Sequence, residues 1–209
     1  FGKIDYMIRN GRVYREVARL AREKNASLIM VGTHGTSGYD PFWIGSNANK
    51  LISASPCPVI TIRLGIDVDR PLERLVMPID DTVETRQKLP VTAEIAKYFN
   101  ATVHILGLYP GSAKEIRKTV DSYCHQVEDH LKNEKIKTQV ETMDGGNFTK
   151  TTIDYARSVD ANLIAIMTEQ TKSAMNLWLG PYAQQMVNQS PVPVLSVHPK
   201  EFLRTVAGL

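Results

Sequence analysis

The chain has 209 residues, of which 43% are hydrophobic and 22% charged, and this predicts a globular protein with one large or two small domains. The net charge is only +3, and Arg12 and Arg15 alternate with Glu16 without interleaved aromatic residues, which argues against a nucleic-acid partner. No run of about 18 apolar residues and no leader is present, and Cys57 and Cys124 lack metal-ligand spacing, so we expect no membrane partner and a cytoplasmic location.

The first half is predicted to contain a helix, a strand, a glycine-rich loop, a second helix and a last strand. A buried stripe with i, i+7, i+8 spacing, formed by Val13, Leu20 and Ala21, marks the first helix. The segment VGTHGTSGYDPFWIGS, residues 31–46, then has three glycines and a serine where the strand passes into the second helix. A loop of this composition is a candidate phosphate site.

Residues 64–71, LGIDVDRP, have turn and charge character and are predicted to form a linker. Beyond them, strands alternate with helices, which predicts a parallel sheet covered on both faces. Pro90 would break the first of these helices unless the helix begins there or bends. We expect strands at 75–79, 102–108, 137–141, 163–168 and 194–197, and helices at 84–99, 113–134, 149–158 and 182–188.

The two halves repeat each other when the sequence is shifted by 135 positions. Residues from Ile29 onward then superpose without a gap on residues from Ile164 onward. Identical pairs in this register are Trp43 with Trp178, Gly45 with Gly180, Pro56 with Pro191 and Pro58 with Pro193, and the helical face Ala48, Leu51 and Ile52 falls on Ala183, Met186 and Val187. Such a register predicts a tandem repeat.

The first half is the shorter of the two. The same shift places Phe1 opposite Ile136, so residues 72–135, with two strands and two helices, have no counterpart. The start at Phe1, without a methionine, favours a processed fragment or a piece of a longer protein. The remaining third strand of the first half would have open edges and a bare apolar face. We expect a cleaved piece, a further stretch of chain or a swapped second chain to cover it.

Several motifs together resemble the universal stress protein family in its tandem form. Gly32, Gly35, Gly45 and Ser46 fit the family pattern G-x2-G-x9-G-[ST]. The segments SPCPV and SPVPV, which precede the last strands, and PID at residues 78–80 are also similar to family segments. The resemblance covers nearly the whole chain.

The resemblance implies an α/β fold made of two Rossmann-like, adenine-nucleotide-binding domains. Each would be a five-stranded parallel sheet of order 3-2-1-4-5, with the nucleotide bound where strands 1 and 4 diverge. Residues 1–66 would be the C-terminal part of the first domain, which is incomplete, and residues 70–200 a complete second domain.

The chemistry of the first loop fits a phosphate. Glycine lets the main chain approach an anion closely and adopt positive φ. The first amides of the following helix lack internal partners, and its dipole adds about 0.3–1 kcal/mol per charge. The predicted nucleotide-binding residues are Gly32, Thr33, His34, Gly35, Gly45, Ser46 and Asn47. Ser46 would add a hydroxyl or act as the N-cap, His34 also fits a solvent-facing loop residue, and the ligand would be ATP or AMP, with or without Mg²⁺.

The second half has lost this pattern. The exchanges are Gly32 to Met167, Gly35 to Gln170 and Ser46 to Pro181. They remove the tight turn, add side chains to the cradle and delete one amide donor, while proline at a first helical position lets the helix survive. We therefore expect a folded but nucleotide-blind second half. Asp80, which matches the family's nucleotide-contacting aspartate, belongs to this half, so neither copy alone carries a complete site.

Three functions are compatible with these features. The first is an adenine-nucleotide-binding regulatory protein of the stress response, which self-associates through its last strands, 59–63 against 194–198, and forms a homodimer or binds the missing N-terminal piece. The alternative is an interaction or dimerisation module that binds no nucleotide. An enzyme ranks third, because Asp80 and Asp81 fit a turn and His125 and His130 lack i, i+4 spacing; slow ATP hydrolysis stays open.

Overall fold

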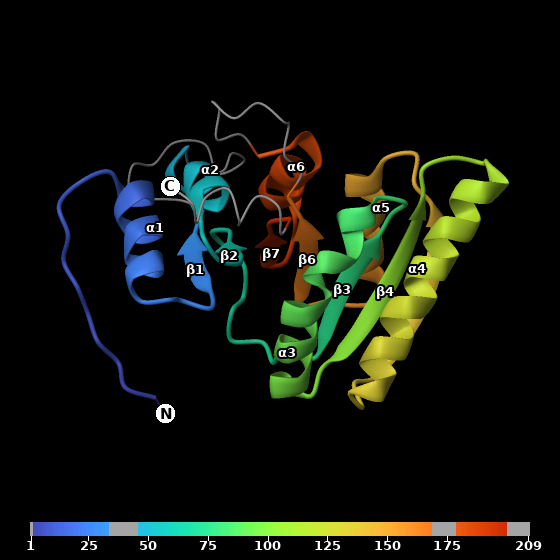
Figure 1. The fold of residues 1–209 in the computed structure, drawn as a ribbon, viewed down its shortest axis with the longest axis horizontal. Helices are drawn as coiled ribbons and strands as arrows, with labels where there is room; N and C mark the ends of the chain where they lie inside the picture. The colour runs from blue at the N-terminus through green and yellow to red at the C-terminus, as the bar shows by residue number, and fades with distance from the viewer. Residues whose placement is uncertain (1, 34–45, 169–178, 200–209) are drawn as a thin grey trace.

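A computed structural model describes residues 2–33, 46–168 and 179–199 of the chain (Figure 1). Its strands form one seven-stranded sheet with the order β1-β2-β7-β6-β3-β4-β5. The strands are β1 (Ile29–Gly32), β2 (Val59–Ile62), β3 (Arg74–Ile79), β4 (Thr102–Tyr109), β5 (Thr138–Asp144), β6 (Leu163–Met167) and β7 (Val194–Val197). The mixed α/β fold predicted from the sequence is confirmed.

The described helices are α1 (Val13–Glu23), α2 (Ser46–Ala54), the 3₁₀ helix η1 (Val83–Lys88), α3 (Leu89–Phe99), α4 (Lys114–Asn133), α5 (Phe148–Ser158) and α6 (Pro181–Gln189). The continuous helix expected at 84–99 is wrong in its first part. Pro90 lies in the first turn of α3, where a missing N–H costs nothing, so the α-helix begins there and 3₁₀ turns precede it. Within the described residues, no helix is both long and apolar enough to span a membrane.

The two halves meet between β2 and β7, the second and third strands of the sheet. β1 and β2 are parallel to each other, and β7, β6, β3, β4 and β5 form a second parallel set. The last strands of the two halves, β2 and β7, pair antiparallel with Ile60 opposite Leu195. The predicted contact between the last strands is therefore present, and it makes one continuous sheet.

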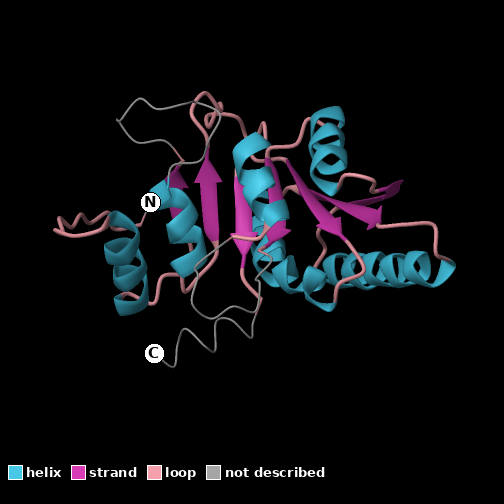
Figure 2. Ribbon diagram, turned by 90° about the horizontal axis from the view of Figure 1, so that it is seen from above, coloured by secondary structure: helices cyan, strands magenta, loops and turns pink. Residues whose placement is uncertain are grey.

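Helices cover both faces of this sheet. Buried residues of α1, α2, α5 and α6 share one core cluster, while those of α3 and α4 belong to the other. Figure 1 shows α3 and α4 in front of β3 and β4. Figure 2 shows that the strands at the two ends of the sheet point in clearly different directions, as a twisted sheet requires.

The third strand expected for the first half does not form. By the 135-residue shift it would lie near residues 2–6, but residues 2–10 have no regular structure and Ile4 is 93% exposed. A strand needs a hydrogen-bonded neighbour, and within the described residues β1 is already the edge of the sheet. The segment is instead held to α1 by an ion pair between Arg9 and Glu23 at 2.5 Å.

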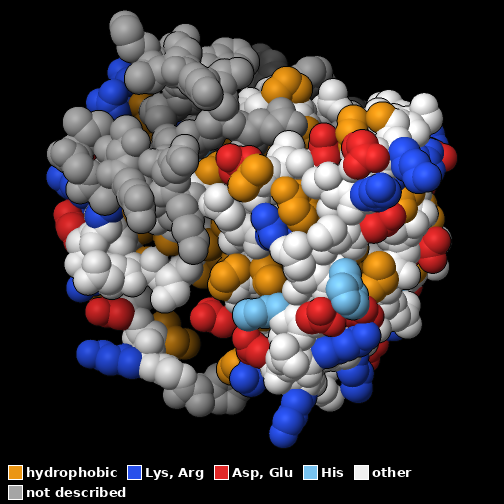
Figure 3. Space-filling view, turned by 45° about the vertical axis from the view of Figure 1, so that its right-hand side comes forward, with side chains coloured by type: hydrophobic (Ala, Val, Ile, Leu, Met, Phe, Trp, Pro, Cys, Tyr) orange, Lys and Arg blue, Asp and Glu red, His pale blue; other side chains and the backbone are white. Residues whose placement is uncertain are grey.

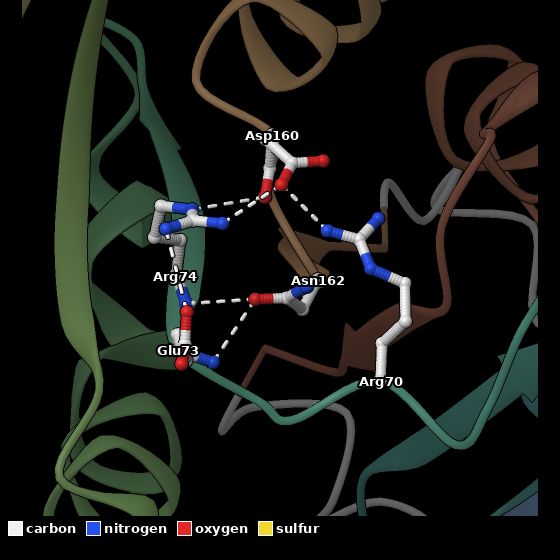
Figure 4. A network of polar contacts seen from close by, with 5 residues as sticks. All are labelled: Arg70, Glu73, Arg74, Asp160 and Asn162. Atoms are coloured by element: carbon white, nitrogen blue, oxygen red, sulfur yellow. Dashed lines mark hydrogen bonds and ion pairs between the residues drawn. The ribbon is translucent and has the colours of Figure 1, made fainter.

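The end of the linker is fixed to the second half by a polar network at the start of β3 (Figure 4). The Asn162 side-chain oxygen accepts hydrogen bonds from the backbone N–H groups of Glu73 and Arg74 at 2.9 and 3.0 Å. The Asp160 carboxylate accepts from the guanidinium groups of Arg70 and Arg74 at 2.6 and 2.8 Å. These contacts fix where the linker enters the second half.

Charged side chains of both signs are mixed on the surface. Figure 3 shows lysine and arginine side chains next to aspartate and glutamate over the right-hand side of the molecule. Lys132 pairs with Glu128 at 2.7 Å, for example, one helical turn away on α4. The view shows no extended area of a single charge among the residues drawn in colour.

Candidate functional site

The first-half site is built from the end of β1 and the beginning of α2. β1 ends at Gly32, which is exposed, and the buried Thr33 then donates its backbone N–H to the Ile62 carbonyl at 2.9 Å. α2 begins at Ser46 and connects the parallel strands β1 and β2. A helix that connects two parallel strands starts at the carboxyl edge of the sheet, so the free amides of α2 face the edge at which β1 ends.

The structure places part of the predicted residue set. Gly32, Thr33 and Asn47 are described, and Asn47 is exposed at the start of α2. His34, Gly35 and Gly45 lie outside the described residues, and for Ser46 only its position as the first residue of α2 is described. The role of these residues therefore stays a prediction, while the two secondary-structure ends that would frame the loop are in place.

The corresponding strand and helix ends of the second half, those of β6 and α6, differ. β6 ends at Met167, and Thr168 repeats the backbone bond of Thr33 by donating to the Val197 carbonyl at 2.9 Å. α6 begins at Pro181 after Gly180, so the prediction that proline would leave this helix intact is confirmed. The α6 N-terminus has one amide donor fewer than that of α2, because proline has no N–H.

Asp80 directly follows β3, the neighbour of β6 in the sheet, and one of its carboxylate oxygens is held in a turn. One oxygen accepts hydrogen bonds from the Thr82 backbone N–H at 2.9 Å and the Thr82 hydroxyl at 2.5 Å. The Asp80 N–H donates in turn to the Thr85 hydroxyl at 3.1 Å. This is the turn that the sequence favoured over a paired-carboxylate site.

Lys88 lies near Asp80, and its role was not predicted from the sequence. Its side chain is 1% exposed, and the ammonium donates to the Thr85 carbonyl and, at 3.3 Å, to the Thr85 hydroxyl. Burial lowers the pKa of Lys88 to about 8, and the negative charge of Asp80 opposes that shift. The sequence pattern does not predict this burial, because lysine side chains are almost never fully buried unless they are paired.

His198 connects the two halves. It follows β7, is 3% exposed, and has Nε2 at 2.5 Å from the Ile52 carbonyl on α2. A carbonyl only accepts, so Nε2 carries the proton and Nδ1 accepts from the Thr168 hydroxyl at 2.7 Å. Burial lowers the pKa of His198 to about 4, so the ring is neutral at pH 7.

Arg63, which the 135-residue shift places opposite His198, makes the reverse connection. Its guanidinium donates at 3.2 Å to the carbonyl of Ser190, which follows α6. Each half therefore sends one side chain from the end of its last strand to a carbonyl at or near the end of the other half's last helix. The helix that starts at the first-half loop is thus held at its far end by the second half.

Among the described residues, no three His, Cys, Asp or Glu side chains lie close enough together to hold a metal ion. His125 lies 3.4 Å from Asp129 and His130 lies 3.1 Å from Glu134, in both cases on the exposed face of α4. These pairs fit surface charge contacts.

Comparison with protein-family models identifies the family of the chain. A family model described as "Universal stress protein family" matches residues 2–63 and 71–198. Universal stress protein YxiE of Bacillus subtilis (strain 168) is 41% identical over 54 residues, which are 26% of this chain and 36% of that protein. The match therefore spans about a third of the length of this relative.

Solved structures show the same fold. The crystal structure of a putative universal stress protein from Pseudomonas aeruginosa UCBPP-PA14 superposes with a TM-score of 0.73 at 16% identity, covering 93% of this chain and 71% of that one. The universal stress protein from Archaeoglobus fulgidus in complex with dAMP gives a TM-score of 0.50 at 17% identity, covering 61% of this chain and 99% of that one.

Proposed function

The chain belongs to the universal stress protein family, and we propose that its first half binds the phosphates of an adenine nucleotide, ATP or AMP, at the loop between β1 and α2. One observation carries the proposal: β1 ends at Gly32 and α2 begins at Ser46 on the same edge of the sheet, bracketing the glycine-rich sequence. Free helix amides at that edge suit an anion. The dAMP complex of the Archaeoglobus relative supports the choice of an adenine nucleotide.

The second half is proposed to bind no nucleotide. Met167 and Pro181 stand where the first half has Gly32 and Ser46, and the Asp80 carboxylate is tied into its own turn by Thr82. A nucleotide that bound there would meet the Met167 side chain in place of a glycine and would do without one amide donor. The second half therefore has a structural role: its β7 pairs with β2, and its His198 holds α2.

Binding would act as regulation and not as catalysis. α2 runs from the proposed phosphate site to Ile52, whose carbonyl contacts His198 of the second half. A ligand at the start of α2 can therefore change how the halves pack, and we propose this as the output of a cytoplasmic stress-response protein that also forms homodimers. Mg²⁺, where used, would be held by a triphosphate, as is usual for this ion.

Calorimetric titration with ATP and AMP tests the proposal. We expect about one nucleotide per chain, with stabilisation of roughly 2.7 kcal/mol at 1 mM ligand for a dissociation constant of about 10 µM. Two nucleotides per chain would show that the second half also binds. Absence of heat and of any thermal shift at millimolar ATP and AMP would contradict nucleotide binding by this chain.

The absence of binding would favour the alternative, an interaction module without nucleotide. The antiparallel pairing of β2 with β7 supports this second function, because it shows that the last strand of one half recognises the last strand of the other. The two functions differ in their response to ligand, so the same titration separates them.

A further inference from the structure

A polar pocket lies at the amino ends of β3, β4 and β5. Since these strands are parallel, their amino ends share the edge of the sheet opposite to Asp80 and Thr168. The pocket has a volume of about 590 Å³, within the usual range for small-molecule sites. It is lined by Glu73, Arg74, Asn100, Thr102, His104, Lys137, Gln139 and Val159.

The lining is rich in hydrogen-bond donors and carries a net positive charge. Val159 is the one apolar residue among the eight that line the pocket. Arg74 and Lys137 contribute two positive charges and Glu73 one negative charge, while burial and the nearby Arg74 guanidinium lower the pKa of His104 and keep its ring neutral at pH 7. A small anion is therefore favoured over a cation or an apolar ligand.

Two of the polar side chains are held in place before any ligand arrives. Arg74 donates from Nε to the Asp160 carbonyl at 3.0 Å and also binds the Asp160 carboxylate (Figure 4). His104 is 3% exposed, and its Nδ1 lies 3.2 Å from the Tyr155 hydroxyl. Fixed donors lose little conformational entropy when they bind a ligand.

The remaining donors are available to a ligand. Among the described residues, no partner is found for His104 Nε2 or for the exposed Lys137 ammonium. When Nδ1 accepts from Tyr155, Nε2 carries the ring proton and serves as a donor. The Asn100 and Gln139 amides and the Thr102 hydroxyl add donors from the other sides. The many acceptor oxygens of a phosphate match donors that converge from several directions better than the two oxygens of a carboxylate do.

We propose that this pocket binds the phosphate group of a small molecule, with Lys137 as the charged partner and His104 Nε2 among the neutral donors. Arg74 lines the pocket and also contacts Asp160, which pairs with Arg70 of the linker. A bound phosphate therefore lies next to the contact that fixes the linker to the second half. The site is made only of residues at the linker end and in the second half, so it is independent of the first-half nucleotide site.

Titration of the ¹⁵N-labelled chain with inorganic phosphate, at constant ionic strength against chloride, tests the proposal by NMR. We expect saturable shifts of the backbone amides at 102–104 and 137–139, with a midpoint in the millimolar range. Lys137→Gln removes a charge-assisted hydrogen bond and is expected to weaken binding roughly fivefold to tenfold. Lys135→Asn, which removes a nearby exposed charge outside the lining, serves as the matched control and should leave the midpoint unchanged.

Three outcomes would overturn the proposal: no saturable shift at these amides up to about 50 mM phosphate, the same shifts with chloride, or equal weakening by Lys137→Gln and Lys135→Asn. A failure of the proposed nucleotide binding can be distinguished from a failure of this phosphate site. Gly35→Asp, which alters the first-half loop, should leave the phosphate shifts at 102–104 and 137–139 intact.

Discussion

Lys88 is an ionisable group placed in the core. Its ammonium is surrounded by protein, with Thr85 as its hydrogen-bond partner, and it keeps its charge at pH 7 because burial lowers its pKa only to about 8. Removing the ammonium from water raises the free energy of the folded state, whereas the lysine of the unfolded chain is fully hydrated. Lys88 is therefore expected to destabilise the fold at neutral pH.

The stability of the protein should rise with pH through this residue. Between pH 8 and 10.5 the unfolded lysine binds more protons than the folded one, so the free energy of unfolding increases by an amount on the order of 3 kcal/mol. Lys88→Met should remove that increase and be more stable at pH 7 by about 1–3 kcal/mol. Urea unfolding of both proteins at pH 7 and 10 measures this difference.

Two results would contradict this account of Lys88. One is a Lys88→Met variant that is less stable than the parent at pH 7, which would mean that the bonds to Thr85 outweigh the desolvation of the charge. The other is an equal pH dependence in both proteins, which would place the titration on other groups. Tyrosines and cysteines also titrate in this range, and the comparison with the variant cancels their contribution.

The residue scale is also where prediction from sequence was weakest. The glycine spacing indicated that a strand ends near Gly32 and that a helix begins near Ser46. These positions could be predicted because the turns and helix starts that glycine and serine favour depend on neighbouring residues in the sequence. Lys88 and His198 were missed, since their roles depend on the desolvation and contacts that only the folded chain creates. His198 meets Ile52 across 146 positions of sequence, and no periodicity predicts such a contact.

At the scale of elements, the alternation of apolar runs predicted every strand of the second half, with shifts of a few residues at the ends. β5 extends to Asp144 instead of ending at 141, because its last residues continue the ladder with β4. The third strand of the first half failed for the opposite reason. Its residues have strand-like character, but within the described residues β1 is the edge of the sheet and no further strand accepts their hydrogen bonds.

Asn162 joins two elements and gives a test at this scale. Its side-chain oxygen accepts two backbone N–H groups at the start of β3, so Asn162→Ala would leave both donors without this partner and is expected to lower the free energy of unfolding by about 1–3 kcal/mol. Asn162→Asp keeps the acceptor oxygen and should lose less. Chemical denaturation of the three proteins provides the comparison. Equal losses in the two variants would show that the amide itself, and not its acceptor oxygen, matters.

At the scale of the whole molecule, the two halves are joined by a strand pair and by side-chain hydrogen bonds that cross between them, among them those of Thr61, Arg63 and His198. Antiparallel pairing of β2 with β7 makes the sheet continuous. His198 reaches the Ile52 carbonyl and Arg63 reaches the Ser190 carbonyl, at positions related by the sequence repeat. The His198 contact holds the C-terminal part of α2, whose N-terminus frames the proposed nucleotide site.

The His198 contact predicts acid sensitivity of this junction. The folded pKa is about 4 against an ordinary value of 6.5, so the neutral ring stabilises the fold above pH 6.5, and this contribution is lost as the pH falls from 6.5 to 4. The loss is on the order of 3 kcal/mol. Unfolding curves at pH 7 and 4.5 should show a larger drop for the parent than for His198→Gln. Parallel drops in the two proteins would contradict this role.

The central claim is that the first-half loop, and not its degenerate counterpart, binds the nucleotide. The most direct measurement is the ATP affinity of two variants that place the same new charge at positions related by the repeat, Gly35→Asp and Gln170→Asp. Repulsion of the phosphates should weaken binding at least about tenfold in Gly35→Asp, while Gln170→Asp binds like the parent chain. Unchanged binding in Gly35→Asp together with loss of binding in Gln170→Asp would contradict the account.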